Sequence, residues 1–499
     1  MTTTVQTRAG RGEHIGLAVL ALPTILVALD LSVLYLALPH VAADLGASGV
    51  QQLWITDIYG FLVAGLLVTM GTLGDRIGRR RLLMIGAACF TVASILAAYS
   101  TSPALLIASR ALLGVAGSTM VPSTMALIGV MFTDPRQHAR AITVWMCCFM
   151  GGAALGPVVG GVLLEHFWWG SVFLMGVPVM LLLLVLGPRA LPEQRDPAAG
   201  RLDLPSVGLS LAAVLPFVYG LKSLSRNGFD VFAALAVLVG TGCAVAFVRR
   251  QRRLASPLLD LRLFGNRTFS TALTMTVFAG LIAANQLFVS MYLQSVVGLS
   301  PAAAGLWLLP STVAMVVSMQ FGPMLARLMP VPVVIAGGLV VSAVGFLTLT
   351  QVSGGGLTTL VAGLVVANLG LGPMAGLCTV LAMQSAPPER AGSAGALAST
   401  AGELGLAMGV AVIGMIGTAL YSGGVAVPAG VPAAAADTAR ESVTGALAVA
   451  ESLSPVDGER LVGSAFDAIT ASMHASAAIC AGLVLLAGAL TVFGLRGQR

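Results

Sequence analysis

Long apolar segments alternate with short polar turns along almost the whole chain of 499 residues. A membrane-spanning helix takes about 20 predominantly apolar residues, and most of these segments reach that length. The pattern therefore predicts an all-α polytopic membrane protein with fourteen transmembrane helices. The segments that we expect to cross the membrane are 15–38, 52–73, 81–99, 104–126, 139–162, 168–187, 205–222, 231–248, 268–291, 302–325, 331–350, 356–382, 392–417 and 472–494.

The basic residues support this count. An even number of spans puts both termini on one side, and if that side is the cytoplasm, all but five of the 26 Lys and Arg residues lie there, as the positive-inside rule requires. The exceptions are Arg110, which falls inside a span, and Lys222, Arg226, Arg440 and Arg460. Arg8 and Arg11 precede the first apolar segment without a suitable cleavage site, so that segment is expected to stay as a span.

Composition excludes several other classes of protein. Charged residues make up 9% of the chain, where a soluble protein has about 25%. The six cysteines all lie in apolar segments and are expected to be buried small residues, not a disulfide framework or a metal site. The five histidines are widely spaced, and no phosphate-binding loop of the Walker type is present. We therefore expect that the protein is not an enzyme, uses no cofactor and has no nucleic-acid partner.

Several motifs interrupt the apolar pattern. A turn with four arginines, Gly71–Arg81, separates two spans and is expected on the cytoplasmic side. The other motifs are Asp30–Pro39 at the end of the first span, Arg110 with Gly114 and Gly117 in the fourth, Gly152, Gly156-Pro157 and Gly160-Gly161 in the fifth, and Pro257–Phe264 before the ninth.

Together these motifs resemble the fourteen-span drug:proton antiporters of the major facilitator superfamily, particularly the QacA and LfrA type of multidrug efflux pump. The resemblance implies two six-helix bundles plus two inserted spans, and export driven by the proton gradient. Twelve spans is the default in this superfamily, and the pair at 205–248, with Arg226 and Asp230 in its turn, is the evidence for two more. Tyr35 departs from the pattern, since many relatives carry Asn there.

The spans divide the chain into three parts. We expect an N-terminal six-helix bundle in residues 1–190, two inserted spans with linkers in 191–253, and a C-terminal six-helix bundle in 254–499. The polar stretch 421–470 is expected to form a helical hairpin outside the membrane, with a helix start at Ser454. It carries more acids than arginines, and either draws cations towards the exit or is a solvated cover without a role in transport.

Four ionisable residues lie inside predicted spans, namely Asp30, Asp57, Arg110 and Glu403. Such residues cost free energy in the membrane unless they are paired or hydrated, so each is a candidate for function. The resemblance assigns proton coupling to Asp30 and Arg110, because a carboxylate near an arginine changes its proton affinity when the two separate. The alternative is a static ion pair that holds two helices together.

Asp57 lies between two aromatic residues, Trp54 and Tyr59, and this combination suits a lipophilic cation. A carboxylate that merely meets water at the outer interface is the alternative, since Trp and Tyr also mark that interface. Glu403 lies between two glycines near mid-membrane, and is a cation site, a second proton site or a hydrogen-bonded neutral acid. We therefore treat Asp57, Glu403, Tyr59 and Trp54 as substrate-binding candidates.

Two groups of residues are candidates for conformational gating. The first is the charged turn, whose acid and basic residues could clamp neighbouring helices, with Gly74, Asp75, Arg76, Gly78 and Arg79. The second is the glycine-proline run of the fifth span, with Gly156, Pro157 and Gly160, where the proline bends the helix and the glycines permit close packing. Ordinary helix packing explains these glycines equally well.

The sequence thus predicts a proton-coupled antiporter that exports lipophilic, mainly cationic drugs, dyes and antiseptics from the cytoplasm or inner leaflet. Its expected partners are these substrates, protons and membrane lipid, and it is expected to be a monomer in the bacterial cytoplasmic membrane. Two alternatives stay open: a dedicated exporter of one natural product, and a membrane sensor that transports nothing.

Overall fold

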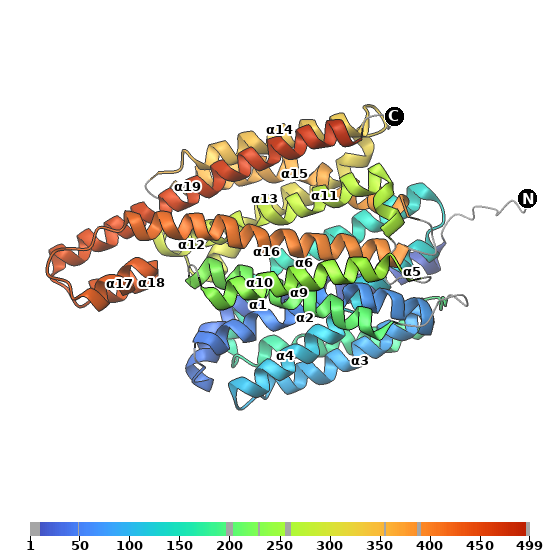
Figure 1. The fold of residues 1–499 in the computed structure, drawn as a ribbon, viewed down its shortest axis with the longest axis horizontal. Coiled ribbons are helices and arrows are strands. Elements are labelled where there is room, and N and C mark those ends of the chain that lie inside the picture. The colour runs from blue at the N-terminus through green and yellow to red at the C-terminus, as the bar shows by residue number, and fades with distance from the viewer. Residues whose placement is uncertain are drawn as a thin grey trace, which may run out of the picture. The chain divides into compact units, whose positions relative to one another are not determined.

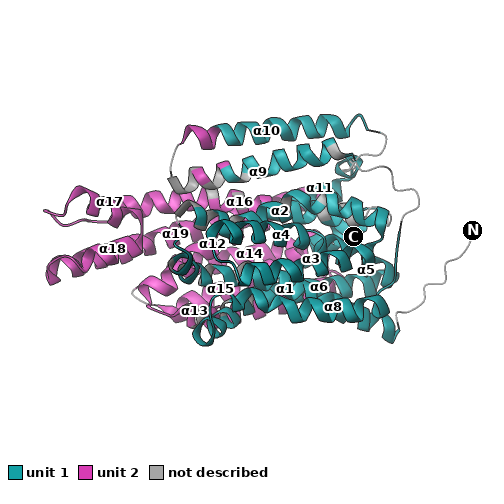
Figure 2. Cartoon of the chain, turned by 90° about the horizontal axis from the view of Figure 1, so that it is seen from below, with its two compact units in different colours: residues 1–219, 235–276, 376–403 teal, residues 220–234, 277–375, 404–499 magenta. Residues whose placement is uncertain are grey.

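The computed structural model describes residues 10–47, 49–195, 203–227, 230–254, 261–353, 356–386 and 391–495. Within these ranges the chain is helical, with no strand, as the sequence predicts (Figure 1). It divides into two compact units: residues 1–219, 235–276 and 376–403 form unit 1, and residues 220–234, 277–375 and 404–499 form unit 2 (Figure 2). The division into two six-helix bundles with an insertion stays a prediction.

Twelve helices or broken helices of the described residues are long and apolar enough to cross a membrane. A thirteenth is the bent pair Ile58–Leu67 and Thr69–Ile77, which belongs to the second predicted span. The remaining predicted span coincides with a 24-residue helix whose apolar part is shorter, Pro205–Phe217. Each predicted span thus coincides with helical structure, while the count of fourteen membrane crossings stays a prediction.

Unit 1 contains the N-terminal helices. They are α1 (Arg11–Leu45), α2 (Gly49–Ile77), α3 (Arg79–Ala98), α4 (Pro103–Gly117), α5 (Met120–Met131), α6 (Pro135–His166), α7 (Ser171–Leu174), α8 (Gly176–Ala190) and most of α9 (Leu204–Asn227) and α10 (Val231–Gln251). The first six spans pack mainly as α1 with α6 and α8, α2 with α4, and α3 with α4 and α8.

Close packing of α1 and α6 depends on a glycine of the predicted gating run. A Cβ atom at Gly152 would stand 2.4 Å from the carbonyl oxygen of Ile25. The backbones of α1 and α6 therefore approach each other at a position where only glycine fits, as small residues permit in membrane helices. Gly156 and Gly160 are also buried in α6, and the side chain of Pro157 lies outside the described residues.

The charged turn between α2 and α3 is shorter than the sequence indicates. Helix α2 continues to Ile77 and α3 begins at Arg79, so that only Gly78 lies between them. Its φ of 108° lies in a region that side chains with a Cβ rarely adopt, which explains the glycine. Gly74 and Asp75 are therefore in the last turns of α2, and not in a loop as predicted.

Unit 2 is built around the long C-terminal helix. Its helices are α12 (Asn285–Met291), the π-helical turn η2 (Tyr292–Val296), α13 (Pro301–Leu325), α14 (Val331–Leu349), α17 (Ala433–Glu441), α18 (Val443–Ala450) and α19 (Pro455–Gly494). The 3₁₀-helix η1 (Leu261–Gly265) belongs to unit 1, and α11 (Arg267–Ala283), α15 (Leu357–Gln384) and α16 (Ala391–Gly424) contribute to both units. Helix α19 packs on α14, α12 and α18.

The predicted outer stretch is largely helical. Ser454 caps α19, accepting a hydrogen bond from the backbone N–H of Asp457, and Pro455 occupies the first helical position, as the sequence indicates. Helices α17 and α18 occupy 433–450 and pack on each other. The sequence predicts that the last span begins at 472, whereas α19 runs without interruption from 455 to 494, because no helix-breaking residue separates the polar and apolar parts.

Candidate functional site

The two charged residues assigned to proton coupling form an ion pair. Asp30 lies in α1 and Arg110 in α4, 80 residues apart, and Arg110 Nη1 lies 2.7 Å from Asp30 Oδ2. Only 1% of Arg110 and 6% of Asp30 are exposed. At this distance the arginine donates a charge-assisted hydrogen bond to the carboxylate. A charge buried this deeply in a membrane protein requires such a partner.

The guanidinium group of Arg110 has three further contacts. Its Nε donates a hydrogen bond of 3.3 Å to the backbone carbonyl of Ile55 in α2. Its Cζ lies 4.6 Å from the centre of the Tyr59 ring and 5.9 Å from that of Phe173 in α7. The positive charge is thus enclosed by a carboxylate, a carbonyl dipole and two aromatic faces, all of which attract a cation.

Tyr59 fits against two glycines of α4. A Cβ atom at Gly114 would stand 2.8 Å from the Tyr59 carbonyl oxygen, and one at Gly117 would stand 2.8 Å from the Tyr59 hydroxyl. The side chain is 1% exposed, and its hydroxyl has no hydrogen-bond partner among the described residues. In this conformation the ring faces Arg110, so the predicted contact with a substrate would require the ring or its surroundings to move.

Glu403 extends the charged group. It lies in α16, half-buried, and its charge acts on Tyr59 together with those of Asp30 and Arg110. One of the two glycines near it serves helix packing: a Cβ atom at Gly405 would stand 2.2 Å from the carbonyl oxygen of Val277 in α11. Gly405 thus permits the close approach of a helix, and the role of the acid itself stays a prediction.

The other substrate candidates lie on α2. The side chain of Asp57 is outside the described residues. Trp54 stacks on Tyr219 of α9, with ring centres 5.9 Å apart and an angle of 14° between the rings. It also meets Phe61 edge-on at 6.3 Å. Trp54 is therefore part of an aromatic cluster shared by α2 and α9, a contact that the sequence did not predict.

The charged turn is held by the end of α8 and the segment that follows it. Asp75 and Arg79 form an ion pair across the turn, as expected for a clamp between α2 and α3. Arg80 donates from its backbone N–H to Glu193 over 3.2 Å and pairs with the same carboxylate through Nε over 3.4 Å. The side chain of Arg80 also donates to the carbonyls of Pro188 and Leu191, each over 3.1 Å.

Comparison with known proteins identifies the family. The profile of the Major Facilitator Superfamily matches residues 20–410. The chain belongs to the Major Facilitator Superfamily. It is 44% identical over 99% of its length to the multidrug efflux pump LfrA of Mycolicibacterium smegmatis, of which it covers 98%. It is 36% identical over 95% of its length to the methyl viologen resistance protein SmvA of Salmonella typhimurium, of which it covers 96%.

Solved structures agree with this assignment. A bacterial homolog of the human lysosomal transporter Spinster, in an inward-facing conformation, matches with a TM-score of 0.61 and 16% identity, covering 98% of this chain and 99% of that one. The human organic anion transporter MFSD10 matches with a TM-score of 0.59 and 18% identity, covering 96% and 99%. These likenesses show the fold. The chain is thus a multi-pass membrane protein of a transporter superfamily.

Sequence reasoning missed several residues around the ion pair of this Major Facilitator Superfamily member. Ile55 contributes only its carbonyl and Phe173 only a ring face, so neither has a recognisable side-chain pattern. Gly114 and Gly117 belong to the Arg110 motif of the sequence, but their close contact with Tyr59 depends on a neighbouring helix. Glu193 stands 113 positions after Arg80, and nothing local connects the two.

Proposed function

We propose that this protein is a proton-coupled antiporter that exports lipophilic, mainly cationic drugs, dyes and antiseptics. The observation that carries the proposal is the buried ion pair of Asp30 and Arg110. The names of the relatives support drug export as the kind of transport: LfrA is a multidrug efflux pump, and SmvA a methyl viologen resistance protein. We place the protein in the bacterial cytoplasmic membrane as a monomer, with both termini in the cytoplasm.

The ion pair links protonation to conformation. Protonating Asp30 would leave the buried charge of Arg110 without its carboxylate, and losing one partner of a buried pair costs about 3–5 kcal/mol. A conformation that gives Arg110 another partner or admits water is therefore favoured once Asp30 binds a proton. The reverse change restores the pair and releases the proton. Protonation of one carboxylate can thus bias the equilibrium between inward- and outward-facing states.

The substrate side of the cycle uses the other acids. We propose that Asp57 and Glu403 attract the charge of a lipophilic cation, and that Trp54 and Tyr59 contact its apolar part. The substrate enters from the cytoplasm or the inner leaflet, and protons arriving from outside displace it. Each net positive charge that moves inward releases about 2.3 kcal/mol per 100 mV of potential, so an exchange that brings in more protons than the cationic charges it exports can draw on the potential.

We propose that the turn between α2 and α3 and the glycine-proline run of α6 act as gating elements. Gly78, Asp75 and Arg79 set the geometry of the turn, with Gly74 and Arg76 in the adjoining end of α2. Gly156 and Gly160 follow Gly152 at intervals of four residues in α6 and are buried as it is, and Pro157 comes directly after Gly156 in the chain. Movement at either place would accompany the change between inward- and outward-facing states.

Efflux of ethidium from loaded cells, with and without a protonophore, tests the proposal. We expect protonophore-sensitive efflux by the wild type and none above background by Asp30→Asn. The matched control is Asp44→Asn, near the C-terminal end of the same helix, where Asp44 accepts a hydrogen bond from Trp169 Nε1 that an amide oxygen can also accept. Efflux by Asp30→Asn at the wild-type rate would exclude Asp30 as the coupling residue.

A second function, the export of one natural product, is favoured by other relatives. The chain is 34% identical over 80% of its length to the tetracenomycin C resistance and export protein of Streptomyces glaucescens, and 32% identical over 87% to the puromycin resistance protein pur8 of Streptomyces alboniger. A panel of lipophilic cations and neutral drugs separates the two functions. Protonophore-sensitive efflux of several unrelated cations supports the multidrug pump, and efflux of a single compound supports the dedicated exporter.

A further inference from the structure

Helix α9, the first of the two inserted spans, packs on α2 at two places. Near one end, Tyr219 stacks on Trp54 with ring centres 5.9 Å apart. Further along, a Cβ atom at Gly65 would stand 2.8 Å from the side chain of Leu211, so Leu211 sits on the bare backbone of α2. The residue numbers rise along α9 as they fall along α2, so the two helices are antiparallel.

Both contacts lie on the same side of a bend in α2. The helix is bent by 56° between Ile58–Leu67 and Thr69–Ile77. Trp54 and Gly65 precede the bend. The segment Thr69–Ile77, which leads into the charged turn, follows it. From Trp54 to Gly65 is about 16 Å of helix rise, which is more than half of a typical hydrocarbon core. Helix α9 therefore contacts the part of α2 before the bend at two points, Trp54 and Gly65.

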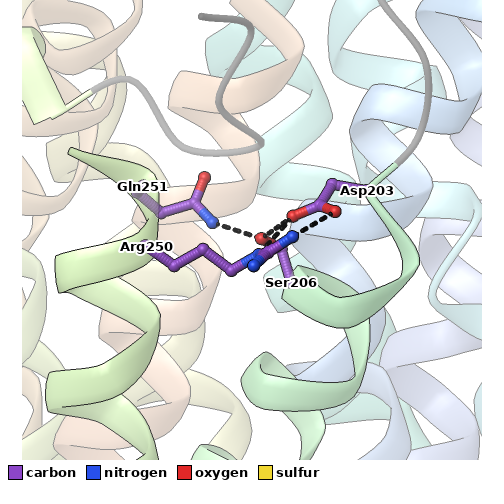
Figure 3. Close-up of polar contacts among 4 residues, drawn as sticks. All are labelled: Asp203, Ser206, Arg250 and Gln251. Carbon is purple, nitrogen blue, oxygen red and sulfur yellow. Dashed lines mark hydrogen bonds and ion pairs between the residues drawn. The ribbon is translucent and has the colours of Figure 1, made fainter. Parts of the chain in front are cut away.

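The inserted hairpin is itself closely packed. A Cβ atom at Gly240 of α10 would stand 2.7 Å from the backbone nitrogen of Phe217 in α9. At the end of the hairpin, Arg250 donates two hydrogen bonds to Asp203, 2.7 Å from Nε and 2.9 Å from Nη2 (Figure 3). Bidentate pairs of this kind restrict the geometry of both side chains. Helix α10 thus packs closely on α9 and stabilises it through these contacts.

The segment of α2 that α9 contacts also touches Arg110 of α4, which forms with Asp30 the ion pair that we call the proton switch. Ile55, whose carbonyl accepts the hydrogen bond from Arg110 Nε, directly follows Trp54 in the chain. Tyr59, whose ring covers Arg110, is one turn further along. Two contacts of the Arg110 guanidinium group, with the Ile55 carbonyl and with the Tyr59 ring, therefore depend on the position of this segment.

We propose that the inserted spans position the proton switch, with Tyr219 acting through Trp54 as a positioning residue for Arg110. This inference rests on the proposed function, in which Asp30 and Arg110 couple transport to protons. Without the stack, the segment around Ile55 moves more freely, and Arg110 is held less firmly against Asp30. Passive packing of an extra pair of helices is the competing explanation, and it would affect protein stability without changing the response to pH.

Proton release on ethidium binding tests the proposal. Purified full-length protein in weakly buffered detergent solution is mixed with ethidium between about pH 5.5 and 9, and released protons are followed with a pH indicator. We expect Tyr219→Ala to shift the midpoint of proton release by about half a pH unit or more towards higher pH. The reason is that Arg110, when it is held less firmly beside Asp30, stabilises the ionised carboxylate of Asp30 less. Tyr219→Phe keeps the ring and should keep the wild-type midpoint.

Three more variants complete the test: Trp54→Ala, its combination with Tyr219→Ala, and Phe232→Ala. Combining Trp54→Ala with Tyr219→Ala should shift the midpoint no further than the larger single change, because both remove the same stack. Phe232→Ala on α10 is the matched aromatic control, since Phe232 is 78% exposed, and it should behave as the wild type.

The outcomes separate the inference from the function on which it rests. A wild-type midpoint for Tyr219→Ala, with or without a loss of thermal stability, would show that α9 only packs against α2. A midpoint shift in Phe232→Ala of equal size would also overturn the inference. If the wild type itself releases no protons, proton-coupled transport of this cation is wrong, and the positioning role fails with it.

Discussion

Four different groups converge on the guanidinium of Arg110: the carboxylate of Asp30, the carbonyl of Ile55 and the rings of Tyr59 and Phe173. Arginine suits such a place because its planar group can donate hydrogen bonds along its edge and present its face to aromatic rings at once. Lysine has the same charge, but its ammonium group is compact and has no planar face to present to the rings, so charge alone does not explain this residue.

Arg110→Lys is therefore expected to impair transport while it preserves the charge. A hydrogen bond to a charged group contributes about 1.5–3 kcal/mol, which corresponds to a rate reduction of about tenfold to a hundredfold. Protonophore-sensitive ethidium efflux, corrected for the amount of protein in the membrane, measures this. Arg136→Lys, at an exposed position in the first turn of α6, should leave the rate unchanged. Wild-type efflux by Arg110→Lys would show that charge is sufficient.

Two substitutions of Tyr59 distinguish the contribution of its ring from that of its hydroxyl group. Because the buried hydroxyl has no partner among the described residues, Tyr59→Phe removes a polar group at little cost and should leave thermal stability unchanged or raised. Tyr59→Ala removes the ring from Arg110 and leaves a cavity, so we expect a loss of about 3–5 kcal/mol. Thermal unfolding in detergent compares the two. A large loss in Tyr59→Phe would reveal a hydrogen bond made in another conformation.

Among the elements, the α2–α3 turn depends on one backbone conformation. Gly78→Ala places a Cβ at a φ of 108° and 2.4 Å from Glu193 Oε1. Glu193 is partly exposed and can move, but the backbone strain stays, at about 1–3 kcal/mol. We expect a lower unfolding temperature and weaker transport.

Gly129→Ala is the control for this substitution. Gly129 lies inside α5, and a Cβ atom there has nothing within 4 Å. Alanine is a better helix former than glycine by about 1 kcal/mol, so the control should be neutral or stabilising. Equal effects of the two substitutions would mean that the turn tolerates a side chain and that its glycine has another cause.

The inserted hairpin gives a prediction on pH. Hydrogen bonds from Arg250 and Ser206 lower the pKa of Asp203 to about 2, while Gln251 donates to Ser206 over 2.7 Å (Figure 3). An unfolded Asp has a pKa of about 3.9. The contribution of Asp203 to stability is therefore present above about pH 4 and is lost as the pH falls towards 2.

Asp203→Asn and Arg250→Gln should each remove this contribution. We expect both variants to unfold at a lower temperature than the wild type at pH 6, and the difference to shrink between about pH 4 and 2. The comparison cancels the titration of other acids, which all three proteins share. A difference that is the same at both ends of this range would mean that the ion pair does not contribute through the charge of Asp203.

For the whole molecule, the long apolar segments and the ion pair could be predicted because they depend on local composition or on a motif. The residues at which helices begin and end could not be predicted, because a helix such as α19 continues far beyond the apolar part of its sequence. Contacts such as Tyr219 with Trp54 or Arg80 with Glu193 depend on which helices become neighbours. The hydrophobic periodicity of one segment does not indicate which other segment packs on it.

The number of membrane crossings is the last whole-molecule prediction, and the inserted hairpin decides it. In a chain whose six cysteines are replaced by serine, Asp230→Cys in the α9–α10 turn and Ser452→Cys after α18 should react with an impermeant maleimide in intact cells. Arg253→Cys, after α10, should react only in permeabilised cells. If the hairpin crosses the membrane twice, Asp230→Cys behaves as Ser452→Cys. Should it instead behave as Arg253→Cys, α9 and α10 would not form two complete crossings, and the count of fourteen would be wrong.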